Sequence, residues 1–117
     1  MSEKNPDTYT PGLGEVIRAA RLYVGLSKDG MAHRLGMSDR SYERIESGER
    51  DCPPGLLDSL DALMDAFDDE VFKLIADATA TGDKIVDVST APREEWHRCV
   101  VGRAAVESKR VMPRAVV

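Results

Sequence analysis

The sequence predicts a mainly α-helical protein, and three features of its first 80 residues predict this fold. Apolar residues recur three or four positions apart between residues 13 and 24, as in an amphipathic helix. Two short segments, 28–35 and 39–46, each follow a serine that can accept N–H groups of a first helical turn. A run rich in leucine, aspartate and alanine covers residues 56–80, again with apolar residues at helical spacing. We therefore expect a helical bundle with a small C-terminal element.

The N-terminal segment differs in character from the first helix. Residues 1–12 are mostly polar and contain two prolines and a glycine, which predicts a flexible tail. The helix after it, residues 13–24, has one apolar face. That face consists of Leu13, Ile17, Ala20 and Val24.

Residues 25–48 contain the most informative pattern of the chain. Ser27 and Ser38 each precede a short helical pattern, and Gly36 between the two patterns can turn the chain sharply at low cost. Two short helices held at an angle by a tight turn form a helix-turn-helix unit, whose second helix lies in the major groove of DNA.

The second helix of this unit has an apolar and a polar face. Tyr42 and Ile45 form a stripe that Met37 completes, and we expect this stripe to pack on the bundle. The opposite face is charged and able to reach outward. It consists of Asp39, Arg40, Glu43 and Arg44.

Residues 13–67 resemble the lambda-repressor-like (XRE-type) helix-turn-helix family, which implies its helical fold and DNA binding. The matching positions are Arg21, Gly25, Leu26, Ser27, Ala32, Leu35, Gly36, Ser38, Ile45, Glu46 and Gly48. The resemblance also implies that Arg21 and Glu46 form a largely buried ion pair between the first and third helices. Such a pair serves folding rather than recognition.

The same resemblance implies which side chains contact DNA. Arginine can donate to guanine O6 and N7 together, and a carboxylate can accept from cytosine N4. The implied base contacts are Asp39, Arg40, Glu43 and Arg44, although Asp39 or Glu43 can instead orient a neighbouring arginine. The implied phosphate contacts, which position the protein without reading sequence, are Lys28, Ser38, Ser41 and Arg50.

The charge of the chain argues for selective binding. Its net charge is −5 and its isoelectric point about 5.0, whereas DNA-binding domains are usually basic. Residues 1–50 are neutral, residues 51–90 carry −8 and residues 91–117 carry +3. The acidic excess is concentrated at 58–70, so it weakens non-specific attraction to DNA and leaves recognition to base contacts.

The second half of the sequence predicts a long helix, a strand and a further helix. Residues 56–80 form either one helix or two with a break near Asp68 and Asp69. Residues 84–89 alternate as a strand does, and Thr90, Pro92 and Glu94 mark the start of the next helix. The apolar stripe of the long helix is Leu56, Leu60, Leu63, Met64, Phe67, Val71, Leu74, Ile75 and Ala78.

A lone strand needs a partner for its backbone groups, which favours a homodimer in which two copies pair antiparallel across a two-fold axis. The alternative is pairing with residues 114–117 of the same chain. The predicted dimer interface is Ile85, Val86, Val88, Trp96 and Val100. In the order of its elements, this region also resembles phage-associated regulators, including anti-CRISPR-associated repressors.

The predicted organisation is a tail (1–12), a helix-turn-helix domain with an extended helix (13–82) and a dimerisation element (83–117). We expect a homodimeric, cytoplasmic and nucleoid-associated transcriptional repressor that binds a palindromic operator in double-stranded DNA. An antitoxin-type regulator or a protein-interaction module that binds a protein through residues 58–70 is the alternative. We expect no enzyme activity, cofactor or metal. Cys52 and Cys99 are expected to be reduced thiols. Together with His33 and His97, these cysteines match no known zinc-finger spacing.

Overall fold

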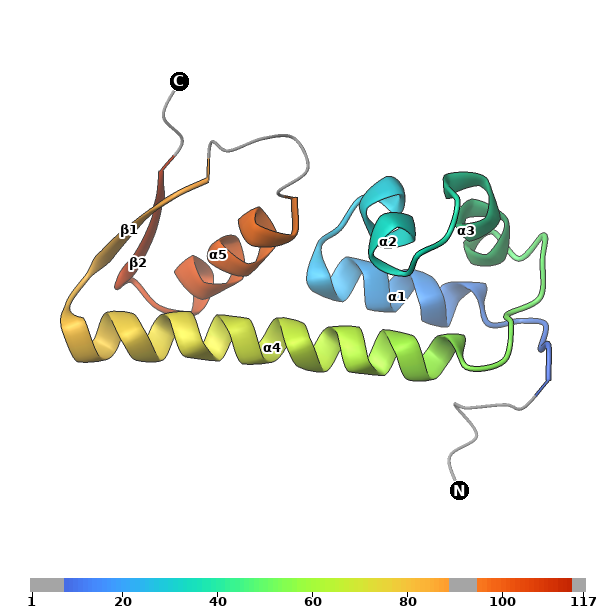
Figure 1. Cartoon of the computed structure of the whole chain (residues 1–117), viewed down its shortest axis with the longest axis horizontal. Helices are drawn as coiled ribbons and strands as arrows, with labels where there is room; N and C mark the ends of the chain where they lie inside the picture. The colour runs from blue at the N-terminus through green and yellow to red at the C-terminus, as the bar shows by residue number, and fades with distance from the viewer. Residues whose placement is uncertain (1–7, 89–94, 115–117) are drawn as a thin grey trace. The chain divides into compact units, whose positions relative to one another are not determined.

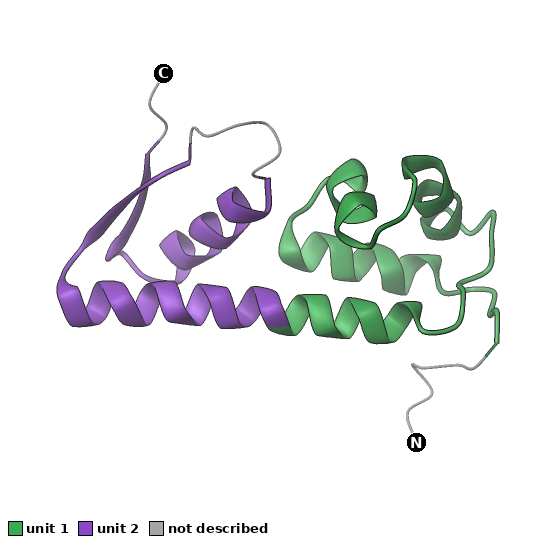
Figure 2. Cartoon of the chain, in the orientation of Figure 1, with its two compact units in different colours: residues 1–65 green, residues 66–117 purple. Residues whose placement is uncertain are grey.

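The computed structural model describes residues 8–88 and 95–114 (Figure 1). The elements are α1 (Gly14–Val24), α2 (Lys28–Arg34), α3 (Asp39–Glu46), α4 (Leu56–Thr81), β1 (Lys84–Asp87), α5 (Glu95–Glu107) and β2 (Val111–Arg114). The predicted mainly helical fold is confirmed. The chain divides into two compact units, residues 1–65 (unit 1) and 66–117 (unit 2), coloured separately in Figure 2.

Unit 1 contains the predicted helix-turn-helix, and its caps are those that the sequence indicates. The Ser27 hydroxyl accepts the Gly30 N–H at 3.0 Å, and the Ser38 hydroxyl accepts the Ser41 N–H at 3.1 Å. Gly36 ends α2 with a positive φ of 69°, a conformation that glycine adopts without strain. The backbone N–H groups after the helix then bond back to its last carbonyls, which closes the turn before α3.

The core of unit 1 joins α1, α2, α3 and the start of α4. The predicted stripe of α3 is buried, with Tyr42 fully covered and Ile45 4% exposed. Met31 and Ala32 of α2 are also fully covered, so the small alanine allows the helices to cross closely. The remaining core side chains include Ile17, Ala20, Val24, Leu57 and Leu60.

Gly14 allows α1 to begin directly against the end of α3. A Cβ atom at this position would overlap the carbonyl oxygen of Glu46 and lie 3.2 Å from its carbonyl carbon. Because both atoms belong to the backbone, no side-chain rotation would relieve the overlap. The missing side chain therefore sets how closely α1 and α3 approach.

The segment before α1 is tied down at Thr10, contrary to the prediction of a flexible tail over residues 1–12. Thr10 and Cys52 exchange two backbone hydrogen bonds of 3.0 and 2.9 Å in an isolated antiparallel bridge. The bridge satisfies backbone groups that lie next to the core, since Cys52 is 3% exposed. The rest of the predicted tail, residues 1–7, lies outside the described residues.

Helix α4 is one continuous helix, which decides between the two alternatives for residues 56–80. Its buried positions shift along the chain from Leu60 in unit 1 to Phe67, Val71 and Ala78 in unit 2. The boundary between the units therefore falls within α4, at residues 65 and 66, and differs from the predicted boundary after residue 82. The second half of α4 belongs with the C-terminal elements because its apolar residues pack in their core.

In unit 2, β1 and β2 form a two-stranded parallel sheet, connected through α5. The register pairs Lys84 with Val111 and Ile85 with Met112. This pairing corrects the expectation that β1 lacks a partner within the chain, which was the reason to pair it antiparallel across a dimer axis. The alternative of pairing within the chain holds, but the partner strand starts at residue 111 rather than 114. The predicted helix-start residues 90–94 lie outside the described residues.

The core of unit 2 is built around Trp96. Its ring meets Phe67 edge to face at 5.5 Å, and its indole N–H donates to the Glu70 carboxylate at 2.8 Å. Trp96 and Val100 are 9% and 5% exposed in the single chain. Both residues were predicted in a dimer interface, and their burial within unit 2 corrects that prediction. Of the predicted interface residues, Ile85 is exposed, and Val86 and Val88 are half-buried.

Candidate nucleic-acid interface

Arg21 and Glu46 connect α1 to α3 at the base of the candidate interface. Arg21 Nε and a terminal guanidinium nitrogen donate to the two Glu46 carboxylate oxygens, each at 2.9 Å. A further Arg21 nitrogen donates to the Leu26 carbonyl at 3.1 Å, in the turn before α2. The Tyr42 hydroxyl also donates to Glu46. These bonds form a polar cluster, Arg21–Tyr42–Glu46, that fixes α3 against α1.

The ionisation of this cluster follows from its surroundings. Burial alone would raise the pKa of Glu46, but hydrogen bonds from Arg21 and Tyr42 and attraction to the guanidinium together lower the pKa below its ordinary value. Burial, and then the bond to Glu46, raise the pKa of Tyr42. Glu46 is therefore held as a carboxylate and Tyr42 as a neutral donor at neutral pH, so the cluster keeps one arrangement.

Helix α3 exposes the face predicted to contact bases. The side chains of Asp39, Arg40 and Glu43 are exposed, and Arg44 is half-buried. Arg40 and Arg44, four positions apart, share the face of α3 opposite Tyr42 and Ile45, and Asp39 and Glu43, also four apart, lie along one side of it. The cluster below α3 fixes the helix, so this face has a defined orientation on unit 1.

The two arginines of this face differ in their surroundings. Arg44 Nε lies 3.8 Å from a carboxylate oxygen of Glu49, in the segment after α3. Such a long, partly exposed ion pair contributes little to stability, so Arg44 can exchange Glu49 for another partner at small cost. Arg40 forms no hydrogen bond or ion pair with any residue that the structure describes. Its guanidinium therefore has all of its donors available for an external acceptor.

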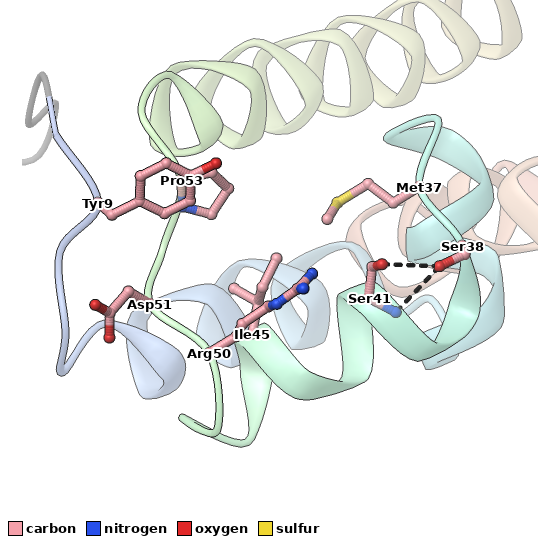
Figure 3. Close-up of a pocket in the computed structure, with 8 residues that line it drawn as sticks. All are labelled: Tyr9, Met37, Ser38, Ser41, Ile45, Arg50, Asp51 and Pro53. Atoms are coloured by element: carbon pink, nitrogen blue, oxygen red, sulfur yellow. Dashed lines mark hydrogen bonds between the residues drawn. The ribbon is translucent and has the colours of Figure 1, made fainter.

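Three of the four predicted phosphate-contacting residues line one surface groove, shown in Figure 3. The groove has a volume of about 560 Å³ and includes Ser38, Ser41 and Arg50. The Ser41 hydroxyl and backbone N–H both approach the Ser38 hydroxyl, at 2.9 and 3.1 Å. Hydroxyl groups beside an arginine at a helix start are suitable donors for a phosphate oxygen. The fourth predicted residue, Lys28, is exposed at the start of α2 but does not line this groove.

The groove also contains residues that sequence reasoning did not assign to DNA. Tyr9 and Pro53 lie at one end of it in Figure 3 and Met37 at the other, and Asp51 lines it as well. The Thr10–Cys52 bridge brings Tyr9 to this position. No local sequence signal predicts that bridge, because its partners are 42 positions apart. The carboxylate of Asp51 would repel a phosphate, so the attraction of this groove for an anion comes from Arg50.

Comparison with known families identifies the family to which this chain belongs. A family model for a helix-turn-helix domain matches residues 13–74, more than half of the chain. The chain belongs to the helix-turn-helix domain family. The match supports the resemblance of residues 13–67 to XRE-type proteins, but it gives no support to the resemblance of layout to phage-associated repressors. No curated protein and no solved structure gave a significant match.

In this helix-turn-helix domain, α2 and α3 are the two helices of the motif, and the family indicates a DNA-binding regulator. Among the described residues, no group of three or more histidines, cysteines or carboxylates is arranged to hold a metal ion. Over the same residues, no helix combines the length and apolar character needed to cross a bilayer.

Proposed function

We propose that this helix-turn-helix protein is a sequence-specific transcriptional repressor in the cytoplasm, which binds an inverted-repeat operator as a homodimer. The observation that carries the proposal is the exposed charged face of α3, fixed by the Arg21–Tyr42–Glu46 cluster and placed beside the Ser38–Ser41–Arg50 groove. Major-groove binding requires a helix that presents base-contacting side chains, here arginines, and nearby groups that can donate to a phosphate.

Within this proposal Arg40 is the main base reader. It is exposed and makes no ion pair with a described residue, so it can bond guanine O6 and N7 without giving up a protein contact. Arg44 must first release Glu49, which adds a small cost. Asp39 and Glu43 share the exposed face and either accept from cytosine N4 or orient these arginines.

The acidic character of the chain agrees with a selective binder. Non-specific binding depends on neutralising phosphates, and the chain as a whole carries −5. Only Arg50 among the groove residues is basic, so the non-specific contribution is small. Specific base contacts must therefore supply a larger share of the affinity than in a basic DNA-binding domain.

A homodimer is proposed for energetic and structural reasons. One recognition helix with two or three base contacts, worth roughly 1–3 kcal/mol each, cannot select one site in a genome. The sheet of unit 2 offers an apolar pair for self-association, because Ile85 and Met112 are register partners and are 64% and 52% exposed. Two copies would read half-sites about one helical turn apart, and occupancy of a promoter would block transcription.

The test is binding of the purified protein to fragments from its own upstream region at several salt concentrations. We expect binding at an inverted repeat, with an affinity that falls as salt rises. Arg50→Gln should reduce the salt slope by about one phosphate contact and weaken all sequences alike. Absence of binding to any fragment at low salt would contradict the proposal.

A further inference from the structure

A second groove of unit 1, about 220 Å³ in volume, lies between α1 and the start of α4. None of its lining residues belongs to α2 or α3, so it is separate from the candidate DNA interface. Its apolar lining has the same spacing on both helices, three and then four positions apart. The residues with this spacing are Val16, Ala19 and Tyr23 on α1 and Leu57, Leu60 and Met64 on α4, and Ala20 of α1 lines the groove as well.

The groove has an apolar floor and partly exposed walls. Leu57 and Leu60 at the floor are 5% and 1% exposed, whereas Val16 and Tyr23 on the wall are 47% and 38% exposed. Each lining face covers about two helical turns, roughly 10 Å of helix axis. A third helix laid along this groove would therefore meet apolar side chains on both sides.

The charged residue that lines the groove is acidic, and further carboxylates lie near it on both helices; we call these carboxylates the acidic rim. Asp61 lines the groove, and Asp58 and Asp65 lie one turn before and after it on α4. Glu15 lies next to Val16 on α1. All four carboxylates are exposed, and none forms an ion pair or hydrogen bond with a residue that the structure describes. No basic residue lines the groove.

This charge pattern selects the occupant. DNA is repelled by the acidic rim, and a second copy seated groove to groove would bring two acidic rims together. A helix with basic flanks instead gains four oppositely charged neighbours while burying its apolar face. We propose that this groove binds an amphipathic helix of another protein, with apolar residues three and four positions apart and lysine or arginine on both flanks.

The probe is a pair of fluorescein-labelled synthetic peptides of about 18 residues, long enough to form a helix. Both carry the same leucine face, and one has lysine flanks where the other has glutamate flanks. Binding to the full chain is measured by fluorescence anisotropy, and the site is mapped by NMR amide shifts. We expect the lysine peptide to bind roughly tenfold or more tightly than the glutamate peptide, with shifts at Val16, Tyr23, Leu60 and Asp61.

Charge reversal makes the test specific to the rim. The double variant Asp61→Lys and Asp65→Lys should reverse the preference between the two peptides, because it exchanges attraction for repulsion. The matched control Asp69→Lys, an exposed position on the same helix outside the groove, should keep the wild-type preference. Circular dichroism of each variant verifies the fold.

Several results would overturn the proposal. These are equal binding of both peptides, no binding of either, shifts that map to another surface, or an unchanged preference in the double variant. The proposal would also be overturned if sedimentation showed that the wild-type chain is a dimer and that Ala19→Glu dissociates it. That result would assign the groove to a second copy of the chain. The DNA-binding proposal does not depend on these outcomes.

Discussion

Arg21 and Glu46 are joined by two parallel hydrogen bonds of 2.9 Å across 25 residues of sequence. Their side chains are 12% and 4% exposed, so the pair is nearly removed from water. Glu46→Gln leaves the Arg21 charge buried without its counter-charge, and we expect a loss of about 3–5 kcal/mol in the free energy of unfolding. Urea denaturation measures this loss.

The control for that variant is Glu43→Gln on the same helix, where the side chain is exposed and forms no hydrogen bond or ion pair with a described residue. A surface substitution of this kind should change stability by no more than about 0.5 kcal/mol. If the two variants lose equal stability, the Arg21–Glu46 pair is not a structural connection between α1 and α3.

The lowered pKa of Glu46 predicts that stability depends on pH. The unfolded chain binds a proton at this carboxyl near its ordinary pKa of 4.5, whereas the folded chain binds it only at lower pH. The stabilisation is therefore complete above pH 4.5 and is lost as the pH falls through the folded-state value. When the pH is lowered from 7 to 3, the free energy of unfolding measured by urea denaturation should fall less for Glu46→Gln than for the wild type. An equal fall in both proteins would contradict this.

Gly14 gives a prediction about the approach of α1 to α3. Gly14→Ala places a methyl group against the Glu46 carbonyl oxygen and should cost about 1–3 kcal/mol, despite the better helix propensity of alanine. Gly102→Ala is the matched control, because Gly102 is also helical and its added Cβ would meet no atom within 4 Å. That control should gain roughly 0.5–1 kcal/mol. Thermal unfolding of both variants decides whether the contact matters.

The exposed pair on the sheet of unit 2 predicts where the homodimer forms. Ile85→Lys combined with Met112→Lys should weaken dimerisation at least about tenfold, since it removes two large apolar side chains from the interface. Val106→Lys, at a position 85% exposed on α5, should leave it unchanged. Sedimentation at several protein concentrations measures both. A double variant that dimerises as the wild type does would place the interface elsewhere.

The parts of the fold that the sequence predicts are those set by local interactions. Ser27 and Ser38 act within one helical turn, and Gly36 acts through its own backbone, so the two short helices and their turn follow from neighbouring residues. The burial of Tyr42 and Ile45 follows from their helical spacing.

The parts that sequence reasoning missed depend on residues far apart in the chain. The partner of β1 is separated from it by a whole helix, and it contains Pro113, which is unfavourable in most strands. Both strands of a two-stranded sheet are edge strands, and proline is tolerated in an edge strand. The Thr10–Cys52 bridge is likewise a tertiary contact without a local signal, because its partners are far apart in the chain.

The candidate interface was predicted in part. The exposure of Asp39, Arg40 and Glu43 follows from the amphipathic pattern of α3. The pairing of Arg44 with Glu49 and the presence of Tyr9 in the same groove as Arg50 required the folded chain, because both depend on where segments outside α3 lie against it.

The central claim is that the exposed face of α3 reads DNA sequence, and Arg40 tests it most directly. The measurement is the ratio of affinities for the selected operator and for a scrambled duplex of equal length, at fixed salt, for wild type and Arg40→Ala. We expect Arg40→Ala to lower this ratio by about tenfold or more with an unchanged circular dichroism spectrum, because one bidentate contact contributes roughly 1–3 kcal/mol of discrimination. An unchanged ratio for both Arg40→Ala and Arg44→Ala would show that α3 is not the recognition helix.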